Sequence, residues 1–253
     1  MQVLTLILLV LMLASQAAGV TIRVPEDAPT IQKAITLADN GDLIEIGAGT
    51  YRERLRVEKK NITLVGRDGP TRTVLDASGL GGSSIECMDV QSGELIIRGL
   101  TITGGVGSGA RYGNEATIGG GVLVLRSSVL IENCRIHGNA ATYEGGGIWA
   151  GDRSDIRVID CQFIADRAER GGGVMVRGGR ATIIGSVFNN VSAIFAGGGI
   201  AVEAGGMIRV GDCRFERCRA SYNGGGVSIY DSDAVLVDSR FTQCHAGISG
   251  GAV

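Results

Sequence analysis

The chain has 253 residues, of which 42 are glycine and only 3 are proline, and its formal net charge is −2 with both signs interspersed. The sequence contains no basic stripe, which argues against nucleic acid as a partner, and the low proline content argues against a proline-rich disordered tract. Only two histidines are present and no CxxC spacing occurs, so nothing indicates a zinc site.

The first 18 residues have the pattern of a signal peptide. Residues 3–13 are apolar apart from Thr5, and Ser15-Gln16-Ala17 supplies small residues at cleavage-site spacing. An uncleaved anchor is the alternative, because only the terminal amine precedes the apolar run as a positive charge. No later stretch is long and apolar enough to span a bilayer. We therefore expect residues 1–18 to be removed and the mature chain, 19–253, to be secreted, periplasmic or displayed at the cell surface.

Residues 30–40 have the pattern of a short amphipathic helix. Thr30 is a suitable N-cap, and Asn40-Gly41 is a typical helix end. Apolar residues at i, i+3, i+4 and i+7 form one face: Ile31, Ala34, Ile35 and Ala38. We expect this helix to cap one end of a repeat array, where core and strand edges would otherwise be exposed.

Irregular coils are predicted for residues 43–103. Short pieces rich in Ile, Val and Leu alternate there with Gly, Asp and Asn, which favour turns. Ile102 then matches Ile136 at a distance of 34 residues, about eight more than the period of the later repeats. We therefore expect residues 104–117 to project as a glycine-rich loop, and both a functional loop and a solvent loop without a role remain open.

Six copies of Gly-Gly-[Gly/Ala]-[Ile/Val] organise residues 119–253. The copies begin at Gly119, Gly145, Gly171, Gly197, Gly224 and Gly250. The steps between them are 26, 26, 26, 27 and 26 residues, and such a fixed period is typical of a solenoid. Each copy has three strand-like parts and no helical pattern, which favours a parallel β-helix over a leucine-rich repeat. The predicted fold class is therefore all-β, with three strands per coil of about 26 residues and an N-terminal capping helix.

Equivalent positions in successive coils should form ladders inside the solenoid, because stacked parallel strands lie ~4.8 Å apart. A ladder of large side chains contains Ile136, Phe163, Phe188, Phe215 and Phe241. A ladder of small side chains contains Cys134, Cys161, Ser186, Cys213 and Ser239. We expect the interior cysteines to act as small hydrophobes. Disulfides joining Cys134 to Cys161 or Cys218 to Cys244 are the alternative. Each glycine triplet should mark a corner where Cβ atoms would crowd or where φ must be positive.

Aromatic residues beside the triplets are the candidate ligand-binding residues. Trp149 should point outwards, because Ile148 and Ala150 point inwards, while Tyr143 and Tyr222 stand just before a triplet. An exposed aromatic ring could stack on a sugar ring or join a partner surface. Packing under a turn or a neighbouring loop is the interpretation that we favour for Trp149.

Glu144, Glu169 and Arg170 are the candidate catalytic residues. Glu144 and Arg170 occupy equivalent positions in successive coils, and Glu169 precedes Arg170. Such a set could perform the acid–base chemistry of a lyase or hydrolase. We favour an exposed cross-strand ion pair of small energetic weight. No aspartate ladder supports calcium, so we expect no metal and no cofactor.

Two parts of the sequence resemble known β-helix families. Thr30–Ile35, Asn40-Gly41-Asp42, Gly49–Glu53 and Asn61–Gly66 resemble the cap and first coils of pectin-lyase-like right-handed β-helices, a superfamily that includes pectinesterases. The repeat, with its Cys/Ser-x-Phe-x-x-Asn segment, resembles repeats of polymorphic outer-membrane proteins. The resemblance implies a right-handed coil, as does the crossover preference of parallel strands. The catalytic motifs of pectinesterases, polygalacturonases and pectate lyases have no match here.

The expected function is therefore that of an exported or cell-surface β-helix module for adhesion, carbohydrate binding or structure. Its expected partner is a polysaccharide or another surface protein. The alternative is a polysaccharide-active enzyme, either a pectate-lyase-like lyase or a glycoside hydrolase, with its site on the outer groove near residues 104–117. The chain stops inside a triplet strand at Gly250–Val253, so we also expect further coils or a membrane-anchoring domain downstream.

Overall fold

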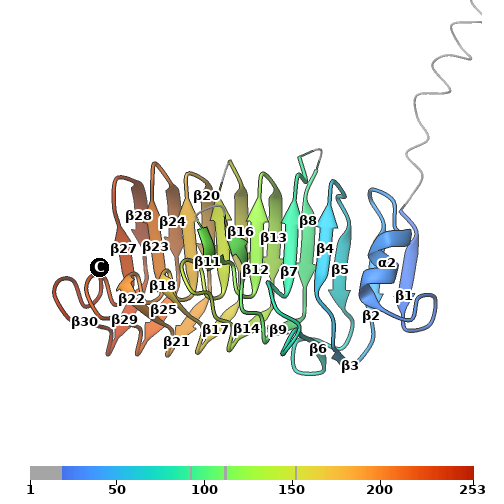
Figure 1. The fold of residues 1–253 in the computed structure, drawn as a ribbon, viewed down its shortest axis with the longest axis horizontal. Helices are drawn as coiled ribbons and strands as arrows, with labels where there is room; N and C mark the ends of the chain where they lie inside the picture. Colours follow the sequence, from blue (N-terminus) through green and yellow to red (C-terminus); the bar gives the residue numbers. More distant parts are fainter. Residues whose placement is uncertain (1–18, 92, 111–112, 152) are drawn as a thin grey trace, which may run out of the picture.

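The computed structural model describes residues 19–253 except 92, 111–112 and 152. In this range the chain is an elongated parallel β-helix whose successive coils add strands to three sheets (Figure 1). The predicted all-β solenoid is confirmed. The predicted signal peptide, residues 1–18, lies outside the described residues.

Three long sheets form the walls of the solenoid, and every strand pairing within them is parallel. Sheet A has the order β1 (Thr21–Val24), β2 (Leu43–Ile46), β5 (Thr63–Gly66), β8 (Leu95–Arg98), β13 (Ser128–Glu132), β16 (Asp155–Ile159), β20 (Arg180–Ile184), β24 (Met207–Gly211) and β28 (Asp233–Val237). Sheet B has the order β3 (Gly49–Tyr51), β6 (Thr73–Asp76), β9 (Thr101–Thr103), β14 (Arg135–His137), β17 (Gln162–Ile164), β21 (Val187–Asn189), β25 (Arg214–Glu216) and β29 (Arg240–Thr242). Sheet C has the order β4 (Leu55–Glu58), β7 (Ile85–Met88), β12 (Val122–Leu125), β15 (Ile148–Gly151), β19 (Val174–Arg177), β23 (Ile200–Glu203) and β27 (Val227–Ile229).

The later coils carry a fourth strand that the sequence pattern does not predict. Sheet D consists of β18 (Arg167–Arg170), β22 (Ser192–Ala196), β26 (Arg219–Ala220) and β30 (His245–Ala246). Its buried positions are occupied by small residues, Ala168, Ala193 and Ala220. In β18 and β26 a lone alanine lies between polar residues, which gives little of the apolar alternation by which a strand is recognised.

The predicted glycine-rich loop at residues 104–117 contains a hairpin, which the sequence analysis did not foresee. Strands β10 (Ser108–Ala110) and β11 (Gly113–Ile118) pair in the antiparallel direction. Ile118, at the end of β11, is buried in a small apolar cluster on the outer face of sheet C. The extra residues therefore cover part of the solenoid wall.

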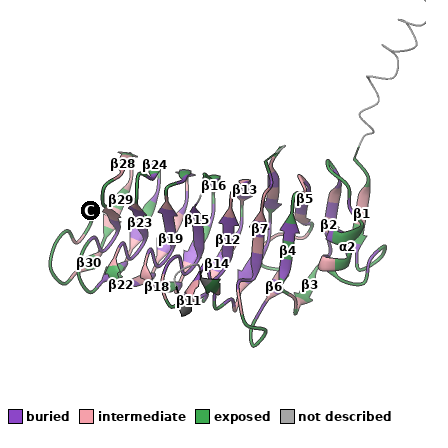
Figure 2. Ribbon diagram, turned by 45° about the horizontal axis from the view of Figure 1, so that its top comes forward, coloured by how far each residue is buried: buried purple, intermediate pink, exposed green. Residues whose placement is uncertain are grey.

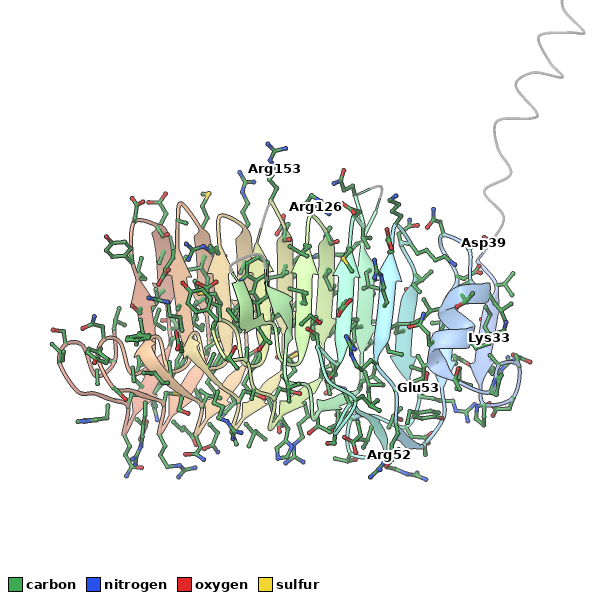
Figure 3. All side chains as sticks on the ribbon, in the orientation of Figure 1. Lys33, Asp39, Arg52, Glu53, Arg126 and Arg153 are labelled. Carbon is green, nitrogen blue, oxygen red and sulfur yellow. The ribbon has the colours of Figure 1, made fainter. Side chains whose placement is uncertain are left out.

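The predicted capping helix is present as α2 (Ile31–Leu37) at one end of the solenoid (Figure 1). Thr30 caps it, because its Oγ1 accepts a hydrogen bond from the Lys33 backbone N–H at 3.1 Å. The Glu53 carboxylate, labelled in Figure 3, adds a second cap by accepting from the backbone N–H groups of Ile31 and Gln32 at 3.0 and 2.9 Å. No helix in the described part of the chain has the length and apolar character needed to cross a membrane.

The helix ends at Leu37, three residues before the predicted end at Asn40-Gly41. The reason is Lys60, whose Nζ donates to the carbonyls of Ile35, Thr36 and Ala38 at 2.9, 3.1 and 2.6 Å. The side chain of Lys60 therefore donates hydrogen bonds to the terminal carbonyl groups of the helix. In many helices these carbonyls instead accept from backbone N–H groups that follow a glycine in the left-handed conformation.

The lumen is one apolar core, and the predicted aromatic ladder runs through it. Phe163, Phe188, Phe215 and Phe241 stack with ring centroids 4.5, 4.7 and 4.6 Å apart and ring planes within 8° of parallel. The six cysteines are thiols, five of them buried and Cys244 half-buried. Figure 2 shows this burial as purple strands between green turns.

The glycine triplets form the coil corners that lead into sheet C, and both predicted reasons for glycine apply. The first glycine of each triplet has a φ between +58° and +69°, a region that L-residues with a Cβ rarely adopt. The second and third glycines lie against the next coil. A Cβ at Gly146, for example, would stand 2.5 Å from the carbonyl oxygens of Gly172 and Arg167.

One buried polar pair interrupts the apolar interior at the turn into sheet D. The Asn139 backbone N–H and its Nδ2 donate to Asp166 Oδ1 at 2.8 and 3.1 Å. Asp166 Oδ2 has no hydrogen-bond partner, and the side chain is fully buried. Burial therefore raises the pKa of Asp166 to about 8, even though the hydrogen bonds from Asn139 favour the ionised form.

Asp166→Asn should flatten the pH dependence of stability. Between pH 4 and pH 8 the folded carboxyl stays protonated whereas the unfolded carboxyl ionises, so rising pH favours unfolding of the wild type. The amide does not titrate. We expect the variant to gain about 2–3 kcal/mol on the wild type between pH 5 and pH 7. Urea unfolding at pH 5 and pH 7 measures this gain. If the stability difference between variant and wild type is the same at the two pH values, Asp166 is ionised in the folded state and the prediction is wrong.

Candidate functional site

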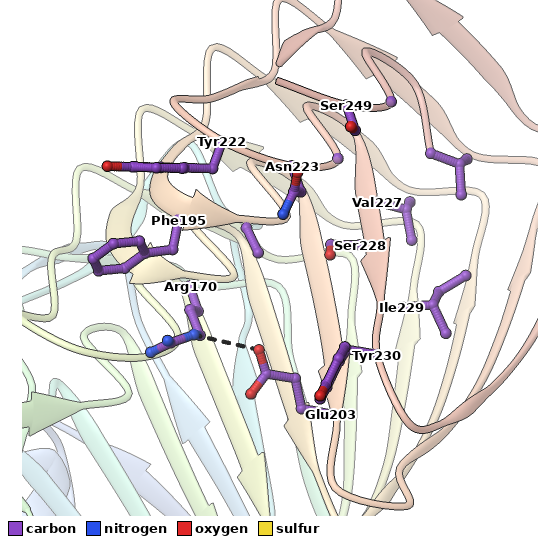
Figure 4. Close-up of a pocket in the computed structure, with 14 residues that line it drawn as sticks. Arg170, Phe195, Glu203, Tyr222, Asn223, Val227, Ser228, Ile229, Tyr230 and Ser249 are labelled. Atoms are coloured by element: carbon purple, nitrogen blue, oxygen red, sulfur yellow. Dashed lines mark ion pairs between the residues drawn. The ribbon is translucent and has the colours of Figure 1, made fainter. Parts of the chain in front are cut away.

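An open cleft of about 670 Å³ lies on the outside of the solenoid, between sheets C and D. Figure 4 shows Arg170 pointing toward Glu203, with the rings of Phe195 and Tyr222 along one side. Tyr230, at the end of β27, is the most exposed of these side chains. A concave surface with several rings and a few converging polar groups is typical of a ligand site.

Two arginines and two glutamates form a connected network beside the cleft. Glu203 Oε1 lies 3.4 Å from Arg170 Nε, and Glu203 Oε2 lies 3.0 Å from Arg177 Nη1. Arg177 Nη1 also lies 3.0 Å from Glu144 Oε1. The Trp149 indole N–H completes the network by donating to Glu144 Oε2 at 2.9 Å.

The stacking of coils produces this network. Arg177 and Glu203 end adjacent strands of sheet C and are register partners. Glu144 and Arg170 are likewise paired across adjacent coils. Each pairing places opposite charges side by side, and the corner between sheets D and C brings the two pairs together.

Glu144 is not the exposed residue that the sequence predicts. It has no exposed surface, and its ion pair runs to Arg177. Burial raises the pKa of Glu144, while the hydrogen bond from Trp149 and the charge of Arg177 act in the opposite direction. Its predicted ion-pair partner, Arg170, lies within 3.4 Å of Glu203. The predicted exposed Glu144–Arg170 pair is therefore wrong, since covering groups keep Glu144 from solvent.

Trp149 lies outside the lumen, as predicted, but only 1% of it is exposed. It packs in the apolar cluster on the outer face of sheet C, whose other members are Ile118, Leu123, Met175 and Ala201. Its ring lies so close to Gly151 that a Cβ there would stand 2.2 Å from the indole. Packing under a neighbouring loop, the favoured interpretation, is confirmed, and Trp149 cannot serve as an exposed sugar platform. Gly151, two residues later in the same strand, is the sequence signal that indicates room for the ring.

The aromatic side chains of the cleft surround Arg170. Its guanidinium carbon lies 5.3 Å from the Tyr143 ring centroid and 5.1 Å from that of Phe195, which is cation–π geometry. The rings of Phe195 and Tyr222 are 5.4 Å apart. Phe195 and Tyr222 are 36% and 44% exposed, whereas Tyr143 is half-buried. Of the three predicted ligand-binding residues, the structure places Tyr222 in the cleft wall and Tyr143 beneath Arg170.

Glu169 lies apart from Glu144 and Arg170. It lines a second hollow, on the side of sheet D that carries Arg167 and Arg219. The three predicted catalytic residues therefore do not share one site. Sequence reasoning missed Arg177 and Glu203 as site residues. Among the residues that the structure describes, no cluster of three or more His, Cys, Asp or Glu side chains could hold a metal ion.

Comparison with known proteins supports the fold. The family model of the right-handed β-helix region matches residues 71–252, which agrees with the predicted handedness. A pectin methylesterase from carrot superposes with a TM-score of 0.54 and 14% identity, covering 92% of this chain and 85% of that chain. A pectin methylesterase in complex with a hexasaccharide gives 0.48 and 15%, with 81% and 70% covered.

These likenesses concern the fold alone, because the sequence identities are too low to carry a reaction across. A search of curated proteins finds no match. The resemblance of the repeats to those of polymorphic outer-membrane proteins stays a prediction.

Proposed function

We propose that this chain, which belongs to the right-handed β-helix family, is a non-catalytic module that binds polysaccharide in the cleft of Arg170, Phe195, Glu203 and Tyr222. Membership of the family fixes the fold but no reaction. The signal-peptide pattern of residues 1–18 supports export, so the proposed place of action is the cell surface or the surrounding medium.

The observation that carries the proposal is that both carboxylates of the network are held by arginine. Glycoside hydrolysis commonly needs two carboxyl groups that flank the bond to be cleaved. Glu144 has no exposed surface, and Glu203 contacts both Arg170 and Arg177. Both carboxylates are already engaged by arginine side chains. The network is therefore better suited to orienting hydroxyl groups than to transferring protons.

The cleft offers the two kinds of contact that sugars use. The exposed rings of Phe195, Tyr222 and Tyr230 present apolar faces on which a sugar ring can stack. Arg170 and Glu203 supply a donor and an acceptor beside these rings (Figure 4). Both polar groups remain partly exposed, so each can still contact a ligand.

Phe195→Ala should weaken polysaccharide binding about tenfold, because it removes a stacking face and one side of the Arg170 contact. Affinity electrophoresis against a panel of neutral polysaccharides measures the change. Leu37→Ala, which trims an exposed side chain on the capping helix, is the control and should bind as the wild type does. Binding that is absent from the whole panel, or equal in the Phe195 variant, would refute the proposal.

The second candidate function is polysaccharide modification or cleavage. It is favoured by the superposition on the carrot pectin methylesterase and by the charged groups that line an open cleft. Turnover of any member of the panel that is lost in Glu203→Gln would establish it in place of the binding function.

A further inference from the structure

A row of basic side chains runs along sheet D in the second hollow. Arg167, Ser192, Arg219 and His245 are register partners on the successive strands β18, β22, β26 and β30. Because parallel strands lie ~4.8 Å apart, the two arginines stand roughly 10 Å apart along the solenoid axis. Arg167, Arg219 and His245 are exposed, and all four residues line a hollow of about 530 Å³.

The two arginines lack compensating partners. Neither Arg167 nor Arg219 makes a side-chain hydrogen bond or an ion pair with any described residue, whereas Arg170 and Arg177 in the neighbouring cleft are both paired. Glu169 is the one acid among the described residues that line the hollow, and it is half-buried. Both arginines line the hollow without a counter-charge of their own, so an anion that spans the row would supply one.

The shape of the hollow selects the kind of anion. The buried alanines of sheet D line it, and Ser192 and Ser221 supply hydroxyl groups. Five successive coils contribute lining residues, so the hollow extends along the axis and fits an extended chain. A flat bilayer would not follow a hollow. No Phe, Tyr or Trp lies among the described lining residues, so base stacking has no platform.

We infer that this hollow binds a linear anionic polysaccharide, whose sulfate or carboxylate groups face Arg167 and Arg219. A guanidinium group recognises either anion through paired hydrogen bonds and keeps its charge at every physiological pH. The inference is separate from the cleft proposed above, because the two sites use different side chains.

Three polymers with one backbone test the inference: dextran sulfate, carboxymethyl dextran and unmodified dextran. We expect the wild type to bind at least one charged polymer in a salt-dependent manner and to ignore the neutral one. Arg167→Gln with Arg219→Gln should weaken that binding at least tenfold. The preference between the charged polymers identifies the anion, and a preference for either supports the inference.

The matched control is Arg214→Gln with Arg240→Gln, which removes the same charge from two register partners on sheet B. This variant should keep most of the affinity, as should Phe195→Ala. If the two double variants lose the same affinity for the charged polymer, the binding depends only on the overall charge of the protein, and the inference is overturned. Tighter binding to anionic vesicles or single-stranded DNA, or no binding to either charged dextran, would also overturn it. All substituted arginines are exposed, and circular dichroism verifies that the variants fold.

Discussion

Gly146→Ala should lower the free energy of unfolding by about 3 kcal/mol or more. The new Cβ would stand 2.5 Å from the carbonyl oxygens of both Gly172 and Arg167. These atoms belong to the backbone of the adjoining coil, so they cannot move aside as a flexible side chain would. The strain would also extend along the solenoid, because each coil is held by its neighbours. Denaturant unfolding followed by circular dichroism measures the loss.

Gly211→Ala is the matched control for this substitution. Gly211 lies in strand β24 without a positive φ, and no atom lies within 4 Å of the position that its Cβ would take. We expect a change within about 0.5 kcal/mol. Equal effects of the two substitutions would contradict the assignment of the triplets as closely packed corners.

Phe188→Ala should cost about 3–5 kcal/mol, because it empties the middle of the aromatic stack. Phe188 is fully buried, and its ring stacks on Phe163 at 4.5 Å and on Phe215 at 4.7 Å. Phe241→Ala is the comparison, since Phe241 is half-buried and stacks on Phe215 at 4.6 Å. We expect it to cost less than half as much in the same unfolding experiment. Equal costs would show that the stack contributes little beyond the burial of each separate ring.

The regular part of the fold could be predicted because, in a solenoid, residues that are one repeat apart in the sequence lie side by side on adjacent coils. A step of 26 residues places Phe241 on Phe215, and the strands pair in that register. The same reasoning identified the glycine corners and the N-cap Thr30. These features depend on local backbone geometry or on the next coil, and both leave a repeating trace in the sequence.

Two of the missed features, the hairpin and the early end of the helix, lie outside the repeat. The hairpin of β10 and β11 occurs once, so no period indicates that Ile118 folds back over Trp149. The early end of α2 depends on Lys60, which the chain brings to the helix from a later coil. Such single contacts between distant residues give the sequence no pattern from which they could be inferred.

Part of the candidate site could have been predicted from the sequence. Arg177 and Glu203 are 26 residues apart and register partners, so the reasoning that paired Glu144 with Arg170 could also have paired them. The burial of Glu144 could not be predicted from the sequence, because it depends on side chains outside the lumen. This burial shifts the interpretation of the site from proton transfer toward ligand binding.

The central claim is that the cleft holds a polysaccharide without altering it. The most direct test is to incubate the protein with the polysaccharide that it binds best in the panel and to assay reducing ends, unsaturated products and released methanol. We predict no product above the level of a protein-free sample, with the bound polymer recovered intact. Product formation that is lost in Glu203→Gln, while binding is retained, would contradict the claim and identify the cleft as an active site.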